Sequence, residues 1–182
     1  MELQTNSKLT RTILIDHSTL TNKTIYLQVT NTANSGGEKM NLNENIINSL
    51  KAKGYEIVDS SQKASYSLFV NVLFANNLKE ARAVQTAVAS GVFGGVSALA
   101  SGSNGSNSLI VGATAALAGG LIGKALEDET FRAVIDITVT NNSNYITDNT
   151  RVYCEAVKTN LNLNEAMPIL EKEATKSIVN IF

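Results

Sequence analysis

Residues 83–123 read AVQTAVASGVFGGVSALASGSNGSNSLIVGATAALAGGLIG and carry no charged side chain. Two apolar arms, 83–100 and 109–123, flank a polar tip at 101–108, and nine of the 12 glycines of the chain lie in this stretch. As helices at about 1.5 Å per residue, the arms would span roughly 27 Å and 23 Å, against a hydrocarbon core of about 30 Å. The pattern predicts a glycine-rich transmembrane helical hairpin.

Small residues recur at every fourth position along both arms. In lipid, helices associate through close backbone packing over glycine and alanine rather than through the hydrophobic effect. We therefore expect these positions to pack the hairpin and to support a homo-oligomer. The predicted membrane and oligomer-packing residues are Ala87, Gly91, Gly95, Gly112, Ala116, Gly119, Gly120 and Gly123.

Two other interpretations of the stretch stay open. Segments rich in Gly, Ala and Ser also form flexible linkers, although Val, Leu, Ile and Phe recur throughout this one. A buried hairpin in a soluble domain is the second alternative, although the remaining residues, about 140, would struggle to cover both arms.

Apolar periodicity predicts regular elements on both sides of this stretch. We expect strands at 24–30, 55–59, 66–75, 131–140 and 150–159, a first helix ended by Gly54, and a last helix starting at Asn162. Residues 1–24 are expected to be an extended polar lead-in and 141–149 a turn. In the strand at 66–75, strict alternation puts Val72 and Phe74 on one face.

These elements predict an α+β fold with a mostly antiparallel sheet packed with two helices. The glycine-rich transmembrane hairpin is expected as an insert between two strands. The predicted domains are a discontinuous α+β domain, 1–77 and 130–182, and the inserted, membrane-embedded helical hairpin, 78–129. The two feet of the insert should leave the sheet side by side.

Composition favours a protein without catalytic chemistry. Net charge is −1, so no basic surplus points to a nucleic-acid partner. The single histidine, His17, and the single cysteine, Cys154, cannot supply the converging groups of a catalytic or metal site. We predict no enzymatic activity and no catalytic, cofactor-binding or metal-ligating residues. His17 is expected on the surface, and Cys154 as a small buried hydrophobe.

Residues 51–77 read KAKGYEIVDSSQKASYSLFVNVLFANN, and residues 160–182 read NLNLNEAMPILEKEATKSIVNIF. With YLQVTNT at 26–32 and the glycine-rich stretch in the matching place, these segments resemble the TraT family of outer-membrane lipoproteins. The resemblance runs in order from about Thr12 to the end of the sequence.

The resemblance implies a function that composition does not show. TraT proteins carry an N-terminal lipid on a cysteine, form large ring-like homo-oligomers in the outer membrane, mediate surface exclusion in conjugation, and are linked to complement resistance. None is known as an enzyme. The expected location is therefore the bacterial outer membrane, and the expected partners are other copies of the chain, outer-membrane lipid and a surface component of the mating cell.

The sequence departs from the family in two places. No lipid-box cysteine stands near its start, so we expect the signal peptide and the lipidated cysteine to belong to a longer precursor. The connection at 141–149 is shorter than in the family. An alternative function also stays open at this point, namely an outer-membrane pore or secretion-associated ring lined by the helical hairpins.

Overall fold

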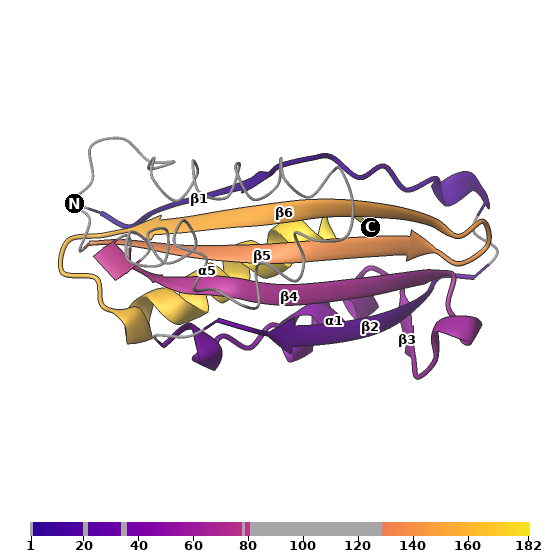
Figure 1. Cartoon of the computed structure of the whole chain (residues 1–182), viewed down its shortest axis with the longest axis horizontal. Helices are drawn as coiled ribbons and strands as arrows, with labels where there is room; N and C mark the ends of the chain where they lie inside the picture. Colours follow the sequence, from indigo (N-terminus) through magenta and orange to yellow (C-terminus); the bar gives the residue numbers. More distant parts are fainter. Residues whose placement is uncertain (1, 20–21, 34–35, 78, 81–128) are drawn as a thin grey trace, which may run out of the picture.

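The computed structural model describes residues 2–19, 22–33, 36–77, 79–80 and 129–182. These residues form one six-stranded sheet, in the order β1-β6-β5-β4-β2-β3, with two α-helices (Figure 1). The elements are β1 (Gln4–Leu9), β2 (Thr24–Asn31), α1 (Asn43–Ala52), β3 (Glu56–Val58), β4 (Tyr66–Asn77), β5 (Thr130–Asn141), β6 (Ile146–Val157) and α5 (Leu163–Val179). Short 3-10 turns lie at η1 (His17–Thr19), η2 (Gly37–Lys39) and η3 (Ser61–Lys63).

The sheet is mixed, and most of its strand pairing is antiparallel, as predicted. Strands β1, β6, β5 and β4 pair antiparallel, whereas β2 pairs in parallel with both β4 and β3. Parallel neighbours need a crossover connection, and α1 carries the chain from β2 to β3. Because β3 is only three residues long, the loop through η3 can return the chain to start β4 beside the start of β2.

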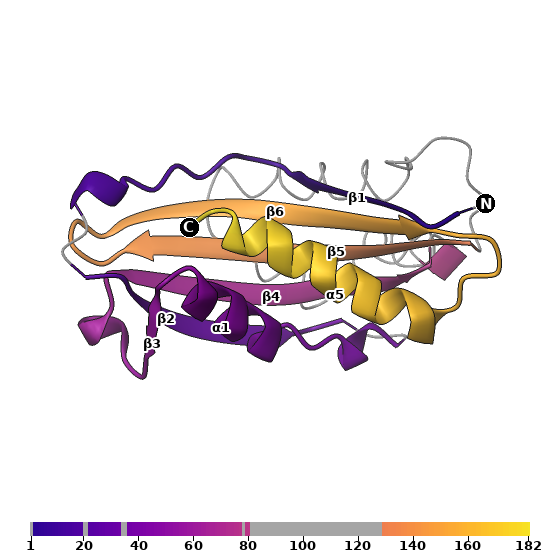
Figure 2. The same cartoon turned by 180° about the vertical axis from the view of Figure 1, so that it is seen from behind.

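Both helices lie on one face of the sheet, as Figure 2 shows from the helix side. The core lies between the two helices and this face of the sheet. It consists of alternate strand residues, such as Leu68, Ile135 and Cys154, and of the apolar sides of α1 and α5. The predicted burial of Cys154 is confirmed. The last helix buries an apolar stripe formed by Met167, Leu170, Ala174 and Ile178, and Ile181 beyond its end is buried as well.

A β-bulge at Leu73 changes the face that the end of β4 presents. The register with β5 shifts between Val72, which pairs with Ile135, and Phe74, which pairs with Val134. Phe74 therefore lies on the face opposite the helices, and the expectation that it shares a face with Val72 is wrong. A bulge inserts one residue into a strand and so reverses the alternation beyond it.

The predicted fold class is wrong in its transmembrane hairpin. The described residues form a mostly-strand sheet with two helices, and no helix among them has the length and apolarity to cross a bilayer. The absence of charge does not by itself favour a helix. The many glycines oppose one, because each glycine in a helix interior costs about 1 kcal/mol relative to alanine. The hairpin residues themselves, 81–128, lie outside the described part of the chain.

The sheet shows where the predicted insert leaves and re-enters. Asn77 at the end of β4 pairs with Phe131 at the start of β5, so the two feet are side by side as expected. Described residues from both parts of the predicted discontinuous domain share one core. The boundaries at 77–78 and 129–130 stay a prediction.

Candidate functional site

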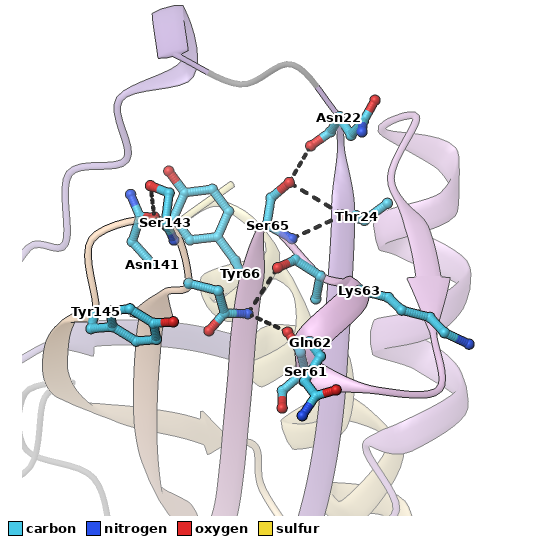
Figure 3. A pocket seen from close by; sticks show the side chains of 12 residues that line it. Asn22, Thr24, Ser61, Gln62, Lys63, Ser65, Tyr66, Asn141, Ser143 and Tyr145 are labelled. Atoms are coloured by element: carbon cyan, nitrogen blue, oxygen red, sulfur yellow. Dashed lines mark hydrogen bonds between the residues drawn. The ribbon is translucent and has the colours of Figure 1, made fainter.

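A pocket of about 600 Å³ opens at the end of the sheet where β2 and β4 begin and β5 ends. Three segments enclose it, namely the start of β2, the η3 loop, and the turn between β5 and β6 (Figure 3). Their lining residues are Asn22, Thr24, Ser61, Gln62, Lys63, Ala64, Ser65, Tyr66, Asn141, Asn142, Ser143 and Tyr145.

Asn142 fastens the β5–β6 turn to the η3 loop. Its amide nitrogen donates to the backbone carbonyls of Ser61 and Ala64, both at 3.0 Å. Its backbone N–H donates to the carbonyl of Ser65 at 3.0 Å, and its Oδ1 accepts from the hydroxyl of Ser67 at 3.2 Å. Asn142 thus holds the two segments together beyond the last residue pair of β4 and β5, and it fixes one wall of the pocket.

Ser65 fixes the part of the pocket between β2 and β4. Its hydroxyl donates to the carbonyl of Asn22 at 2.5 Å, and its backbone N–H donates to Oγ1 of Thr24 at 2.9 Å. These bonds hold the start of β4 against the start of β2, as the dashed lines in Figure 3 show. Hydrogen bonds within the protein therefore hold the walls of the pocket in place.

Tyr145 stands at the rim in an unusual backbone conformation. Its φ is +59°, in the left-handed region that bulky residues seldom occupy. Its backbone N–H donates to the carbonyl of Asn141 at 2.8 Å, which closes the turn. The residue is 82 % exposed, so its ring offers an open aromatic surface beside the pocket.

The lining is almost free of charge. Lys63 is the one ionisable cation among the described lining residues, and its Nζ donates to Oδ1 of Asp59 at 3.1 Å, which lowers the pKa of that carboxyl. No described lining residue carries a carboxylate. The pocket therefore presents amide, hydroxyl and aromatic groups.

The second face, meaning the sheet face opposite α1 and α5, holds two ion pairs. Arg132 and Glu155 have no exposed side-chain surface, and Nε of Arg132 donates to Glu155 at 3.1 Å. Arg151 contacts Asp136 through both Nε and Nη2, the latter at 3.0 Å. Burial would lower the pKa of Arg151, but the hydrogen bond and charge of Asp136 outweigh it and raise that pKa.

His17 is exposed, as predicted, and its Nδ1 lies 3.4 Å from the hydroxyl of Tyr55. Within the described ranges, no three His, Cys, Asp or Glu residues are grouped so that they could hold a metal ion. The predicted absence of enzymatic activity, cofactors and metal stays a prediction.

The predicted packing residues, from Ala87 to Gly123, lie outside the described residues, so their role stays a prediction. Sequence reasoning treated 141–149 as a turn and missed the pocket. It also missed the ion pairs, although a signal existed. Arg132 and Asp136 stand as far before the β5–β6 turn as Glu155 and Arg151 stand after it, so an antiparallel hairpin pairs opposite charges.

The fold and pocket define a mostly-strand α+β protein with an uncharged pocket at the end of its sheet. The family described as "Enterobacterial TraT complement resistance protein" matches residues 2–144 and 138–182. The chain belongs to this TraT family.

Individual relatives agree with the family match. A TraT complement resistance protein from Escherichia coli K12 is 31% identical over 98% of this chain and 86% of its own length. Another from Escherichia coli is 30% identical over the same shares.

Among solved structures, a PelC dodecamer from Paraburkholderia phytofirmans is similar with a TM-score of 0.45 and 11% identity, covering 98% of both chains.

Proposed function

We propose that this protein confers complement resistance on the bacterium that carries it and mediates surface exclusion in conjugation. The observation that carries the proposal is the match to TraT complement resistance proteins over 98% of the chain at 31% identity. A match of this extent includes the sheet, both described helices and the pocket, rather than one shared motif.

The proposal includes location and assembly. In it, the protein acts without catalysis in the outer membrane, is anchored by an N-terminal lipid added to its precursor, and assembles with other copies of itself. The sheet supports self-association because its described edges are β1 on one side and the short β3 on the other. An edge strand leaves backbone N–H and C=O groups that can pair with a second chain.

Serum survival tests complement resistance. Bacteria expressing the full-length gene and bacteria carrying the empty vector are exposed to active human serum and to heat-inactivated serum. We expect higher survival of the expressing cells in active serum and equal survival in inactivated serum. Equal survival in active serum, with the protein detected at the cell surface, would refute this part of the proposal.

Mating frequency tests surface exclusion separately. Recipients with and without the protein are mated with the same plasmid-bearing donor, and transconjugants are counted. We expect fewer transconjugants from expressing recipients. Transformation of the same cells with purified plasmid DNA is the control, since exclusion at the cell surface should leave it unchanged. Equal mating frequencies would count against surface exclusion and leave the serum result standing.

A further inference from the structure

We propose that the pocket at the end of the sheet binds a neutral saccharide. Its lining consists of carboxamide and hydroxyl groups, and each of these both donates and accepts hydrogen bonds. Sugar hydroxyls have the same double capacity, so an uncharged polyol matches the wall group for group. The proposal concerns a ligand that the complement and conjugation functions do not require.

Some of the lining groups hold the wall, and others are open to a ligand. Asn142, Ser65 and Thr24 are committed to the bonds that fix the pocket. Within the described part of the chain, no hydrogen bond is found to the hydroxyl of Ser61 or to the carboxamide of Gln62, and both residues are exposed. A preformed wall with open polar groups is the arrangement that small-molecule sites use.

Tyr145 supplies the aromatic surface that a sugar ring requires. The residue is 82 % exposed, so its ring gains little from burial. Its φ of +59° is strained for a bulky residue. Outliers of this kind gather at functional sites. The C–H groups of a pyranose can pack on the ring while the hydroxyls reach the amides, as weak C–H contacts to aromatic and polar groups allow.

Ionic and peptide ligands fit the pocket less well. Lys63 is the one cation of the described lining, and the carboxylate of Asp59 offsets its charge, so the pocket offers little net positive charge to an anion. A peptide could add to a sheet edge, but the strands at the pocket, β2, β4 and β5, are all internal to the sheet. Their backbone groups pair with neighbouring strands, which leaves side-chain amides and hydroxyls as the binding groups.

Saturation-transfer NMR and calorimetry on the full chain test the proposal. The probes are the methyl glycosides of glucose, galactose and mannose, free N-acetylglucosamine, and trialanine as a neutral peptide. We expect at least one sugar to bind with a Kd of about 0.1–10 mM, as single sugars make few contacts. Failure of every sugar, or binding of trialanine in their place, would overturn the proposal.

Variants at the rim locate the binding. Tyr145→Asn removes the ring and keeps a residue that tolerates the left-handed conformation, so it should weaken binding roughly two- to tenfold. Gln62→Ala should also weaken binding, whereas the exposed Leu3→Ala, beside the end of β6 that lies away from the pocket, should leave it unchanged. Thermal melts confirm that each variant folds. Unchanged binding in both Tyr145→Asn and Gln62→Ala would exclude this pocket.

Lipopolysaccharide distinguishes two sources of the sugar. Micelles of smooth lipopolysaccharide carry a long polysaccharide, and micelles of rough lipopolysaccharide lack it. Binding of smooth micelles that depends on Tyr145 would identify the bacterial surface glycan. Binding of the free glycosides without binding of either micelle would identify a soluble or host glycan. Both results support a saccharide site and name its source.

Discussion

Arg132 and Glu155 form an ion pair without exposed side-chain surface on the second face of the sheet. Two charges removed from water are stable only while each neutralises the other, because the desolvation cost of each ion is several kcal/mol. The neighbours across the strands add to this environment, since Asn76 pairs with Arg132 on the side opposite Glu155. The pair therefore constrains which residues can occupy this part of the sheet.

Glu155→Gln should lower the free energy of unfolding by about 3–5 kcal/mol, because it removes a buried carboxylate charge that contacts the buried Arg132. Urea unfolding followed by circular dichroism measures the loss. Asp59→Asn is the matched control, since it breaks an ion pair whose side chains are 67% and 79% exposed and should change stability little. Similar losses in both variants would show that burial does not decide the strength of these pairs.

Gly54 and Gly37 are required for different reasons. Gly54 has a φ of +85°, and no atom lies within 4 Å of the place a Cβ would take, so only its backbone conformation favours glycine. At Gly37, a Cβ would lie 2.9 Å from the backbone N and O of Ala75, so here only the lack of space favours glycine.

Gly54→Ala should therefore cost about 1 kcal/mol in unfolding free energy, from left-handed strain alone. Gly54→Asn should recover part of this loss, because asparagine tolerates that conformation. Gly37→Asn should be at least as destabilising as Gly37→Ala, because the larger side chain meets the same backbone. Chemical denaturation of the four variants compares them. Recovery by asparagine at Gly37 would contradict the steric explanation.

At the scale of single elements, both described helices end as their sequences indicate. Helix α1 stops in a Schellman motif, with the N–H of Gly54 on the carbonyl of Lys51 at 2.9 Å and that of Tyr55 on Leu50 at 3.0 Å. Helix α5 starts at the predicted cap, where Asn162 Oδ1 accepts from the N–H of Glu165 at 3.1 Å. The reciprocal contact runs from Nδ2 of Asn162 to Glu165 at 2.7 Å.

Asn162→Ala should lower the free energy of unfolding by about 1 kcal/mol, because the N–H of Glu165 loses its acceptor. Asn162→Asp should keep most of the stability, since a carboxylate accepts the same bond and suits a helix N-terminus. Equilibrium unfolding of both variants beside the parent protein gives the two values. A loss in Asn162→Asp as large as that in Asn162→Ala would rule out the capping bond as the cause.

Sequence reasoning found the elements that periodicity defines and missed those that depend on pairing. The strand at 66–75 and the last helix were located because apolar residues repeat along them. Strand β1 was missed because its residues, QTNSKL, are polar and gain their place only by pairing with β6. β6 also begins at Ile146, four residues before the predicted start, since Tyr145 closes a shorter turn than composition suggested.

The same limit explains the site. The pocket combines three segments distant in sequence, and their ends meet because β5 pairs antiparallel with β4 and β4 pairs in parallel with β2. That pairing depends on the α1 crossover and the shortness of β3, neither of which changes the periodicity of the strands themselves. Local pattern therefore predicts single elements well and their arrangement around a pocket poorly.

At the scale of the whole molecule, aromatic contacts join the end of the chain to the core. The ring of Phe182 packs edge-on against Tyr55 and Tyr66, with centroids 5.8 Å and 6.0 Å away. The hydroxyl of Tyr55 donates to the carbonyl of Phe182 at 3.2 Å. Because Tyr55 follows α1 and Tyr66 starts β4, this cluster couples helix, sheet and C-terminus into one cooperative unit.

Four buried weak acids determine how the free energy of unfolding should change as the pH rises into the alkaline range. Burial raises the pKa of the Cys154 thiol, and it raises the pKa values of Tyr55, Tyr66 and Tyr153 as well. Above their unfolded pKa values, about 8.5 for cysteine and about 10 for tyrosine, these groups lose protons on unfolding that the folded state retains. Stability falls with pH wherever the folded state binds more protons.

The free energy of unfolding should therefore show no loss from these four groups below about pH 8.5, decline from there, and fall more steeply above about pH 10. Urea titrations at a series of pH values measure the curve. Cys154→Ala removes the thiol, so its curve should lie lower at neutral pH because of the lost packing, yet stay flatter between about pH 8.5 and 10. An equally steep decline in Cys154→Ala over that interval would show that the buried thiol is not its source.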